Sequence, residues 1–192
     1  DALVPVVSGK LPLFVSTRTE ADIRDAIAFA ERVHVRLVIR AGPEAALVAQ
    51  LLAEKKVPVI LTEVLTLPSR DDMFHAASYQ APGQLARAGV LFAFSENDAS
   101  NVRLLPYEAA IAVAWGLDRQ EAIKALTIRA AEVLGVADLM GSLEPGKLAN
   151  LFIASGDPLE VRTTVTHVFI NGRDVGVRNR HVELYEKWMA RQ

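Results

Sequence analysis

The side chains best suited to chemistry lie where apolar runs of the sequence end. Arg18, Arg40 and Glu63 each close such a run, and the segment Ser95-Glu96-Asn97-Asp98 follows the run VLFAF. Carboxylates of this kind could hold a hard cation such as calcium, but adjacent acids after a strand more often form a turn or cap a helix. The first interpretation of this segment is therefore a turn, and a cation site is the alternative.

The four histidines form no local metal motif. No two of them are separated by two or four residues, which removes the spacing typical of zinc ligands, and each is interpreted as an ordinary histidine. The chain has no cysteine, which excludes disulfides, thiolate metal sites and a Cys nucleophile. It also contains no Gly-x-Ser-x-Gly elbow, phosphate loop or Gly-x-Gly-x-x-Gly sequence. The histidines are His34, His75, His167 and His181.

Alternating short apolar runs and helical patterns precede these candidate side chains. Because the runs are apolar at consecutive positions, they predict a parallel sheet covered by helices on both faces. A polar stretch, Leu67–Pro82, interrupts the alternation. The predicted strands are Leu11–Thr17, Arg36–Arg40, Val57–Glu63 and Val90–Ser95, and the predicted helices are Glu20–Val33, Pro43–Lys55 and Gly83–Ala88.

The second half of the chain is Ala-rich and helical before its pattern changes to β. Asn171-Gly172 is the strongest short hairpin signal in this part,. The expected domains are residues 1–140, a partial β/α barrel, residues 141–178, the strands of a small sandwich, and residues 179–192, a terminal helix. The expected helices are Leu105–Trp115, Arg119–Leu126, Ile128–Leu134 and Val182–Met189, and the expected strands are Ala149–Ala154, Val165–Ile170 and Asp174–Val177.

Three sequence blocks, in their order and spacing, resemble the C-terminal signature of the metal-dependent amidohydrolases, especially imidazolonepropionase-like ones. The central block, GSLEPGKLANLFIASGD at 141–157, is a Pro-Gly turn followed by a short strand. The helical block 121–135 precedes it, and Gly156–Leu159 and Val168–Arg173 follow. None of these blocks holds a catalytic group, so they indicate ancestry more strongly than activity.

The resemblance implies an α/β fold, namely the second half of a (β/α)8 TIM-type barrel plus part of a small C-terminal β-sandwich. A half barrel leaves two open sheet edges, which are prone to aggregation. We therefore expect a homo-oligomer, a separate N-terminal half-barrel polypeptide, or a rearranged Leu67–Pro82 stretch to cover them. The chain starts at Asp1 rather than Met, so a missing upstream segment is also expected.

The resemblance further implies metal ligands at the carboxyl ends of the strands, usually for zinc or another divalent metal. The expected histidine positions carry Ser16 or Thr17 and Arg40 or Ala41, and the expected Asp position carries Asn97. Hydroxyl, guanidinium and carboxamide groups are poor zinc ligands. We therefore expect no metal, and a chain that is catalytically inactive by itself.

The arginines at the strand ends suggest a replacement for the metal charge. In a metal-bearing ancestor, carboxylates at Glu63, Glu96 and Asp98 would face a cation, and buried carboxylates need a counter-charge. We hypothesise that Arg18 and Arg40 supply it, which requires Arg40 to lie within hydrogen-bonding distance of one of these carboxylates. The alternative is that all are ordinary solvated residues of the barrel rim.

The composition limits the classes of binding partner but does not identify the cellular compartment. The net charge of −2, from 21 basic and 23 acidic residues, shows no electrostatic footprint for nucleic acid or an anionic membrane,. No apolar run approaches the roughly 20 residues of a membrane helix. We expect a soluble protein, with the cytoplasm slightly favoured and the periplasm possible, and a small molecule as a potential ligand.

Three functions remain open from the sequence. The first is a non-catalytic amidohydrolase remnant with a structural or ligand-binding role. The second is an active amidohydrolase, completed by an N-terminal segment or partner chain, with Asp98 in a mononuclear site. The third is a small-carboxylate binding module in which Arg18 and Arg40 grip the ligand bidentately.

Overall fold

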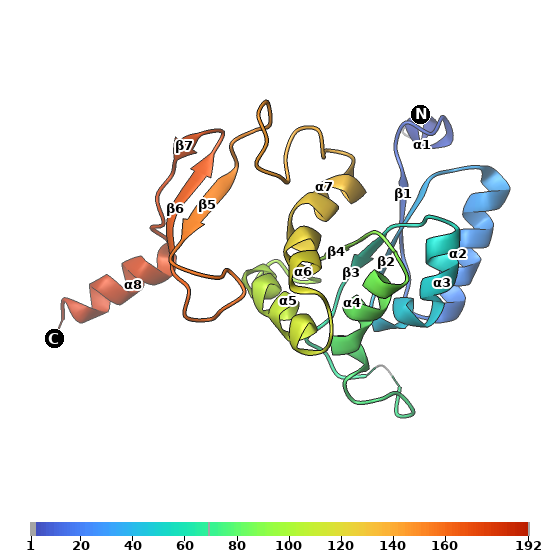
Figure 1. The fold of residues 1–192 in the computed structure, drawn as a ribbon, viewed down its shortest axis with the longest axis horizontal. Coiled ribbons are helices and arrows are strands. Elements are labelled where there is room, and N and C mark those ends of the chain that lie inside the picture. The colour runs from blue at the N-terminus through green and yellow to red at the C-terminus, as the bar shows by residue number, and fades with distance from the viewer. Residues whose placement is uncertain (1–2, 69, 192) are drawn as a thin grey trace. The chain divides into compact units, whose positions relative to one another are not determined.

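The computed structural model describes residues 3–68 and 70–191. The chain forms two compact units, Asp1–Ser142 and Leu143–Gln192, and each is described by itself. Figure 1 shows the order of their elements along the chain.

The first unit contains a four-stranded parallel sheet with the strand order β1-β2-β3-β4. The register places Ser16 beside Arg40, Arg40 beside Ile60, and Ile60 beside Ala93, so these four residues form one row across the sheet. The α/β prediction of four parallel strands alternating with helices is confirmed. The strands are β1 (Leu13–Ser16), β2 (Leu37–Ala41), β3 (Val59–Leu61) and β4 (Phe92–Phe94).

Helices follow each strand, and most begin where the sequence predicts. Two predictions were wrong in detail. The segment Pro43–Lys55 divides into a 3-10 turn and an α-helix, and the helix expected at Gly83 begins at Ala77 with Pro82 inside it. The helical elements are α1 (Val4–Val7), α2 (Glu20–Val33), η1 (Pro43–Val48), α3 (Ala49–Glu54), α4 (Ala77–Arg87), η2 (Val102–Leu104), α5 (Leu105–Ala114), α6 (Arg119–Leu126) and α7 (Ile128–Leu134).

The core forms on both faces of the sheet because nearly all strand positions are apolar. On one face, Val38 of β2 and Ala93 of β4 pack with Val133 of α7. Alternate strand positions such as Ile39 and Leu61 are almost fully buried on the other face. In Figure 1, α2 and α3 lie on the opposite side of the strands from α5, α6 and α7.

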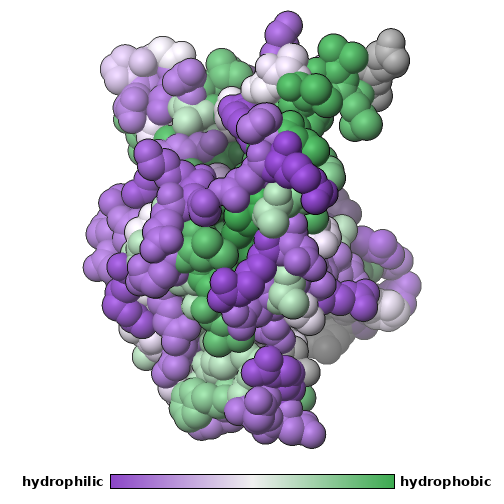
Figure 2. Space-filling model, turned by 90° about the vertical axis from the view of Figure 1, so that its right-hand side faces the viewer, coloured by the Kyte–Doolittle hydropathy of each residue, from purple (hydrophilic) through white to green (hydrophobic). Residues whose placement is uncertain are grey.

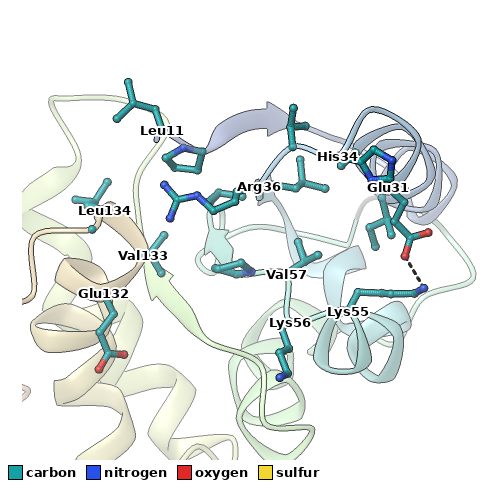
Figure 3. Close-up of a pocket in the computed structure, with 18 of the residues that line it drawn as sticks. Leu11, Glu31, His34, Arg36, Lys55, Lys56, Val57, Glu132, Val133 and Leu134 are labelled. Atoms are coloured by element: carbon teal, nitrogen blue, oxygen red, sulfur yellow. Dashed lines mark ion pairs between the residues drawn. The ribbon is translucent and has the colours of Figure 1, made fainter. Parts of the chain in front are cut away.

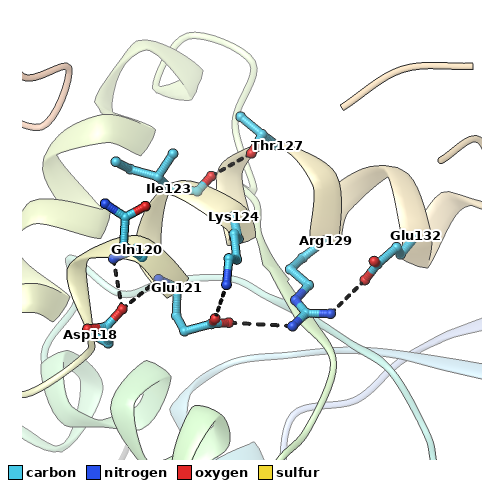
Figure 4. Close-up of polar contacts among 8 residues, drawn as sticks. All are labelled: Asp118, Gln120, Glu121, Ile123, Lys124, Thr127, Arg129 and Glu132. Atoms are coloured by element: carbon cyan, nitrogen blue, oxygen red, sulfur yellow. Dashed lines mark hydrogen bonds and ion pairs between the residues drawn. The ribbon is translucent and has the colours of Figure 1, made fainter. Parts of the chain in front are cut away.

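The junction of α6 and α7 is fixed by polar contacts (Figure 4). Asp118 caps α6 by accepting hydrogen bonds from the N–H groups of Gln120 and Glu121, at 2.8 and 3.0 Å. Glu121 also forms an ion pair with Lys124 at 2.7 Å. Arg129 of α7 lies 3.7 Å from Glu121, so one carboxylate connects the two helices.

The second unit is a three-stranded antiparallel sheet followed by a helix. Asn171 and Gly172 both have positive φ, 51° and 77°, which confirms the predicted Asn-Gly hairpin,. The elements are β5 (Leu151–Ala154), β6 (Val165–Ile170), β7 (Arg173–Asp174) and α8 (Arg180–Met189).

The first described residues of the chain expose apolar side chains. Leu3, Val4 and Val7 of the α1 region are 68, 59 and 69% exposed, and Figure 2 shows the corresponding hydrophobic surface at the top of the molecule. Among the described residues, no helix has the length and apolar character needed to cross a membrane.

Candidate functional site

A hollow of about 540 Å³ opens where the carboxyl ends of the strands meet. This edge is where parallel β/α folds usually place their functional loops. Six of the residues singled out from the sequence line it, and the lining comes from the ends of the strands and from the loops after β1, β2, β3 and β4. The lining residues are Ser16, Thr17, Arg18, Arg40, Gly42, Pro43, Glu44, Thr62, Glu63 and Asn97.

Three of these side chains form a continuous hydrogen-bonded chain. Arg40 Nη2 donates to Asn97 Oδ1, and Asn97 Nδ2 donates to Glu63 Oε1. Both ends of the Asn97 amide are therefore used, one by a cation and the other by an anion. We call this set, Arg40, Asn97 and Glu63, the amide relay.

The backbone at Glu63 is left-handed. Its φ is +63°, a conformation that costs energy for a residue with a side chain,. The loop after the neighbouring strand β2 is in ordinary van der Waals contact with this side chain, since a Cβ placed on Gly42 would lie 3.4 Å from Glu63 Oε2. Retained strain of this kind is concentrated at functional sites, and here it accompanies the contact of Glu63 with Asn97.

Arg18 lies at the start of α2, where a capping box fixes the backbone. Thr19 Oγ1 accepts from the Asp22 N–H at 3.2 Å, while the Asp22 carboxylate accepts from the N–H groups of Thr19 and Arg18 at 2.9 and 3.0 Å. These backbone hydrogen bonds lower the pKa of Asp22. The Arg18 guanidinium makes no hydrogen bond or ion pair with any residue that the structure describes, but its charge also helps to lower the pKa of Asp22.

The remaining sequence candidates lie outside the lining of the hollow. Asp98 turns its carboxylate onto Ser100, accepting from its N–H at 2.8 Å and its hydroxyl at 2.7 Å, and these bonds lower the pKa of Asp98. This is the turn geometry expected from the sequence as the first interpretation. Glu96 instead interacts with Glu108, a residue of α5 that is 1% exposed.

One expectation of the charge-replacement hypothesis is not met. Arg40 was expected to contact a carboxylate directly, but within residues 3–68 and 70–191 its guanidinium binds the Asn97 amide, and Asn97 alone reaches Glu63. The sequence could not reveal this because the position of Asn97 depends on the loop after β4. Arg40 therefore does not replace the metal as a direct counter-charge of Glu63, Glu96 or Asp98.

Comparison with known proteins agrees with this architecture. The amidohydrolase family model matches residues 13–175. The chain belongs to the amidohydrolase family. A solved amidohydrolase from Thermotoga maritima is 32% identical to this chain with a TM-score of 0.82, and the match covers 91% of this chain and 45% of the Thermotoga maritima chain. Another solved amidohydrolase is 27% identical with a TM-score of 0.63, and the match covers 86% of this chain and 44% of that amidohydrolase.

A further likeness extends to the fold alone. The ochratoxinase of A. niger is 21% identical with a TM-score of 0.65, covering 89% of this chain and 43% of its own. No curated protein matched the chain. This amidohydrolase-family chain thus spans less than half of each of the three solved structures.

The strand-end residues of this amidohydrolase-family chain do not fit a zinc centre. Ser16 offers a hydroxyl, Arg40 has no lone pair to donate, and the Asn97 amide is already held at both ends,. In the described part of the chain, no three His, Cys, Asp or Glu residues group so as to hold a metal ion. The structure therefore gives no basis for a hydrolytic step through a metal held by these residues.

A larger hollow, about 880 Å³, lies at the opposite ends of the strands. Figure 3 shows Arg36, Lys56 and the ion pair of Lys55 with Glu31 around it, over apolar residues such as Val57 and Val133. The Lys55–Glu31 distance is 2.5 Å, and this pairing raises the pKa of Lys55. In β/α barrels, residues at this amino-terminal end of the strands serve stability rather than catalysis. The candidate site is therefore the 540 Å³ hollow at the carboxyl ends, which we call the strand-end hollow.

Sequence reasoning missed several residues of the site. Thr62 and Glu44 are buried, at 4% exposure each. Thr62 Oγ1 donates to the Ala41 carbonyl at 3.3 Å, and Glu44 Oε2 accepts from the Glu20 N–H at 2.9 Å. Glu108 was also missed, although a single acid within the apolar stretch LPYEAAIAVAW was a visible signal.

Proposed function

We propose that this chain is a non-catalytic ligand-binding module of the amidohydrolase family, and that its strand-end hollow binds a small carboxylate. The observation that carries the proposal is the position of Arg18 and Arg40 in one hollow where the family is expected to hold metal. Guanidinium groups bind carboxylates through paired N–H donors. The same side chains disfavour a divalent cation.

The two arginines differ in a way that suggests their roles. Arg40 is held by the Asn97 amide, so it supplies a fixed charge. Arg18 makes no hydrogen bond or ion pair with the described residues and supplies free donors where it lines the hollow. A carboxylate ligand would therefore complete the hydrogen bonding of Arg18 without breaking the amide relay.

Thermal unfolding with small carboxylates tests this function. Succinate, acetate and N-acetylglycine should raise the midpoint temperature of unfolding, because a ligand at about 100 times its Kd stabilises the fold by about 2.7 kcal/mol. Arg18→Met should remove the shift, and Arg18→Lys should restore it only partly because lysine lacks the planar fork. Arg32→Met, an exposed arginine of α2 outside the hollow, is the matched control.

Metal content gives the second test. After incubation with zinc and dialysis, elemental analysis should find far less than one zinc per chain. Stoichiometric zinc, lost in an Asn97→Ala variant, would overturn the non-catalytic proposal.

An active amidohydrolase completed by further protein is the second candidate. The supporting observation is that the chain covers only 45% of the Thermotoga maritima amidohydrolase. In that case zinc would bind, and C–N bond hydrolysis would appear, when a polypeptide carrying the first barrel strands is added. Absence of both zinc retention and hydrolysis in the assembled protein would contradict this candidate.

We further propose that a second polypeptide covers the edge strand β1, either another copy of this chain or an N-terminal half barrel. In the described sheet β1 pairs only with β2. Phe14 on β1 is 46% exposed, and Leu11 just before it is 54% exposed. Unpaired, apolar strand edges favour pairing with another chain. Light scattering should therefore find a dimer or larger, and a stable monomer at high concentration would exclude the homo-oligomer.

A further inference from the structure

Glu108 is a buried acid that lies next to the hollow without lining it. It belongs to the first turn of α5 and is 1% exposed. A charged side chain is rarely buried to this extent unless it is paired, because the loss of hydration is costly. A specific contact or a change of protonation must therefore accompany its burial.

The contacts of Glu108 lead to the two loops that carry the amide relay. Its carboxyl group accepts from the Leu65 N–H and shares a hydrogen bond with the Glu96 side chain. Leu65 lies two residues after Glu63, and Glu96 directly precedes Asn97. One carboxyl group on α5 thus touches both loops whose side chains bond to each other.

A hydrogen bond between two carboxyl groups requires a proton on one of them. Burial raises the pKa of Glu108 to about 8, the hydrogen bond and charge of Glu96 act in the same direction, and the Leu65 N–H opposes them. The Oε2 atom has no hydrogen-bond partner among the described residues. Burial, the contact with Glu96 and the unpartnered Oε2 atom outweigh the Leu65 N–H and favour Glu108 as the neutral acid at pH 7.

Three cations on the described elements packed against α5 bind groups other than Glu108. On α6, Lys124 pairs with Glu121 at 2.7 Å. Elsewhere against α5, Arg87 of α4 donates to the Gly116 carbonyl at 3.3 Å, and Arg103 of η2 donates to the Ser100 carbonyl. The further ionisable groups on these packed elements are Tyr79 and Arg119.

We infer that Glu108 is a positioning residue for the strand-end hollow: as a neutral acid it joins the loops after β3 and β4 and keeps Asn97 hydrogen-bonded to Glu63. This role is independent of which ligand the hollow binds. Loss of the proton places two carboxylates against each other, so the loops separate and the amide relay loosens.

The Glu108→Gln variant separates this role from simple packing. Glutamine keeps the shape, donates to Glu96 and accepts from the Leu65 N–H, but it cannot ionise. Glu108→Leu keeps the apolar volume and removes both contacts. Glu132→Gln is the matched control, since Glu132 on α7 pairs with Arg129 at 3.0 Å, away from both loops.

NMR of the Asn97 side-chain amide and the Leu65 backbone amide, followed through alkaline pH, is the test. In the wild type and in Glu132→Gln, both signals should titrate together with a midpoint near pH 8. In Glu108→Gln the titration should vanish and both signals should stay at their neutral-pH positions. In Glu108→Leu, both should be displaced at every pH.

The inference is overturned if the wild-type Asn97 signals do not titrate, or if they titrate unchanged in Glu108→Gln. If Glu108→Gln fails to fold, carbon-13 labelling of glutamate carboxyls in the wild type decides. A Glu108 midpoint that coincides with that of Asn97 supports the role, and separate midpoints reject it. Neither measurement uses a ligand, so a failure of the carboxylate screen would leave this result intact.

Discussion

The Asn97 amide donates to the Glu63 carboxylate across the loops that follow two adjacent strands, β3 and β4. These residues are 34 positions apart in sequence, and neither belongs to a regular element. Their contact therefore depends on the loop conformations, among them the left-handed backbone at Glu63. Because Asn97 also accepts from Arg40, its amide connects a cation and an anion that line the hollow.

A double-mutant cycle should reveal coupling between Asn97 and Glu63. Each of Asn97→Ala and Glu63→Ala removes the shared hydrogen bond, and the coupling should be about 1 kcal/mol of unfolding free energy, because Asn97 is exposed,. Urea unfolding of the four proteins measures it. The exposed Arg24–Glu20 ion pair on α2 serves as a comparison and should give no more than about 0.5 kcal/mol,. Strictly additive effects at Asn97 and Glu63 would contradict the amide relay.

The capping box of α2 should stabilise the helix that carries Arg18. Thr19→Ala removes the side-chain acceptor for the Asp22 N–H and should cost about 1 kcal/mol in urea unfolding,. Ser8→Ala, which removes an exposed hydroxyl bonded to the Pro5 carbonyl, should cost clearly less. Equal effects of the two substitutions would show that the cap contributes nothing.

Acid should weaken the contribution of Asp22. Its folded pKa is lowered below 3.8 by the N–H groups of Thr19 and Arg18, so the carboxylate stabilises the fold at higher pH and loses this effect as pH falls through the folded pKa. The difference in stability between wild type and Asp22→Asn should therefore shrink on acidification. Thermal midpoints measured from neutral to strongly acid pH test this, and a difference that grows towards low pH would reverse the assignment.

The sequence predicts the strands well because each is a short apolar run ended by polar residues. It also identifies Ser16, Arg18, Arg40, Glu63 and Asn97 as one group, since the ends of parallel strands meet at one edge of the sheet, and all five line the hollow. The helix Glu20–Val33 has the predicted bounds. Periodicity and cap signals are sufficient for such features.

Other features depend on tertiary contacts that no local pattern contains. The sequence predicts a polar stretch up to Pro82 and a helix from Gly83, yet α4 begins at Ala77 and buries Pro82. The expected contact of Arg40 with a carboxylate was replaced by Asn97, because a loop residue inserts between the two charges. Both differences arise from packing and loop geometry, which override the local preference.

Gly141 should tolerate a side chain less well than Gly135. Both have positive φ, 101° and 73°, but a Cβ on Gly141 would lie 2.8 Å from Ala131 Cβ and 3.0 Å from Ile128 Cα, whereas Gly135 has no atom within 4 Å of that position. Gly135→Ala should cost about 1 to 2 kcal/mol from backbone strain alone, and Gly141→Ala should cost more. Urea unfolding compares them, and equal losses would show that the close contact relaxes freely.

Stability should fall as pH rises from 4.5, the ordinary value for glutamate, to about 8, the pKa of folded Glu108. In this range the unfolded chain has released the proton that the folded chain retains, so folding is favoured by lower pH, by up to about 1.4 kcal/mol per pH unit. Glu108→Gln has no proton to lose and should lack this component. Chemical unfolding at a series of pH values measures this. The unfolding free energy of Glu108→Gln should increase relative to that of the wild type up to about pH 8, and the difference should stay constant above that pH. Glu132→Gln should follow the wild type, and parallel pH profiles for wild type and Glu108→Gln would mean that folded Glu108 ionises like an exposed glutamate.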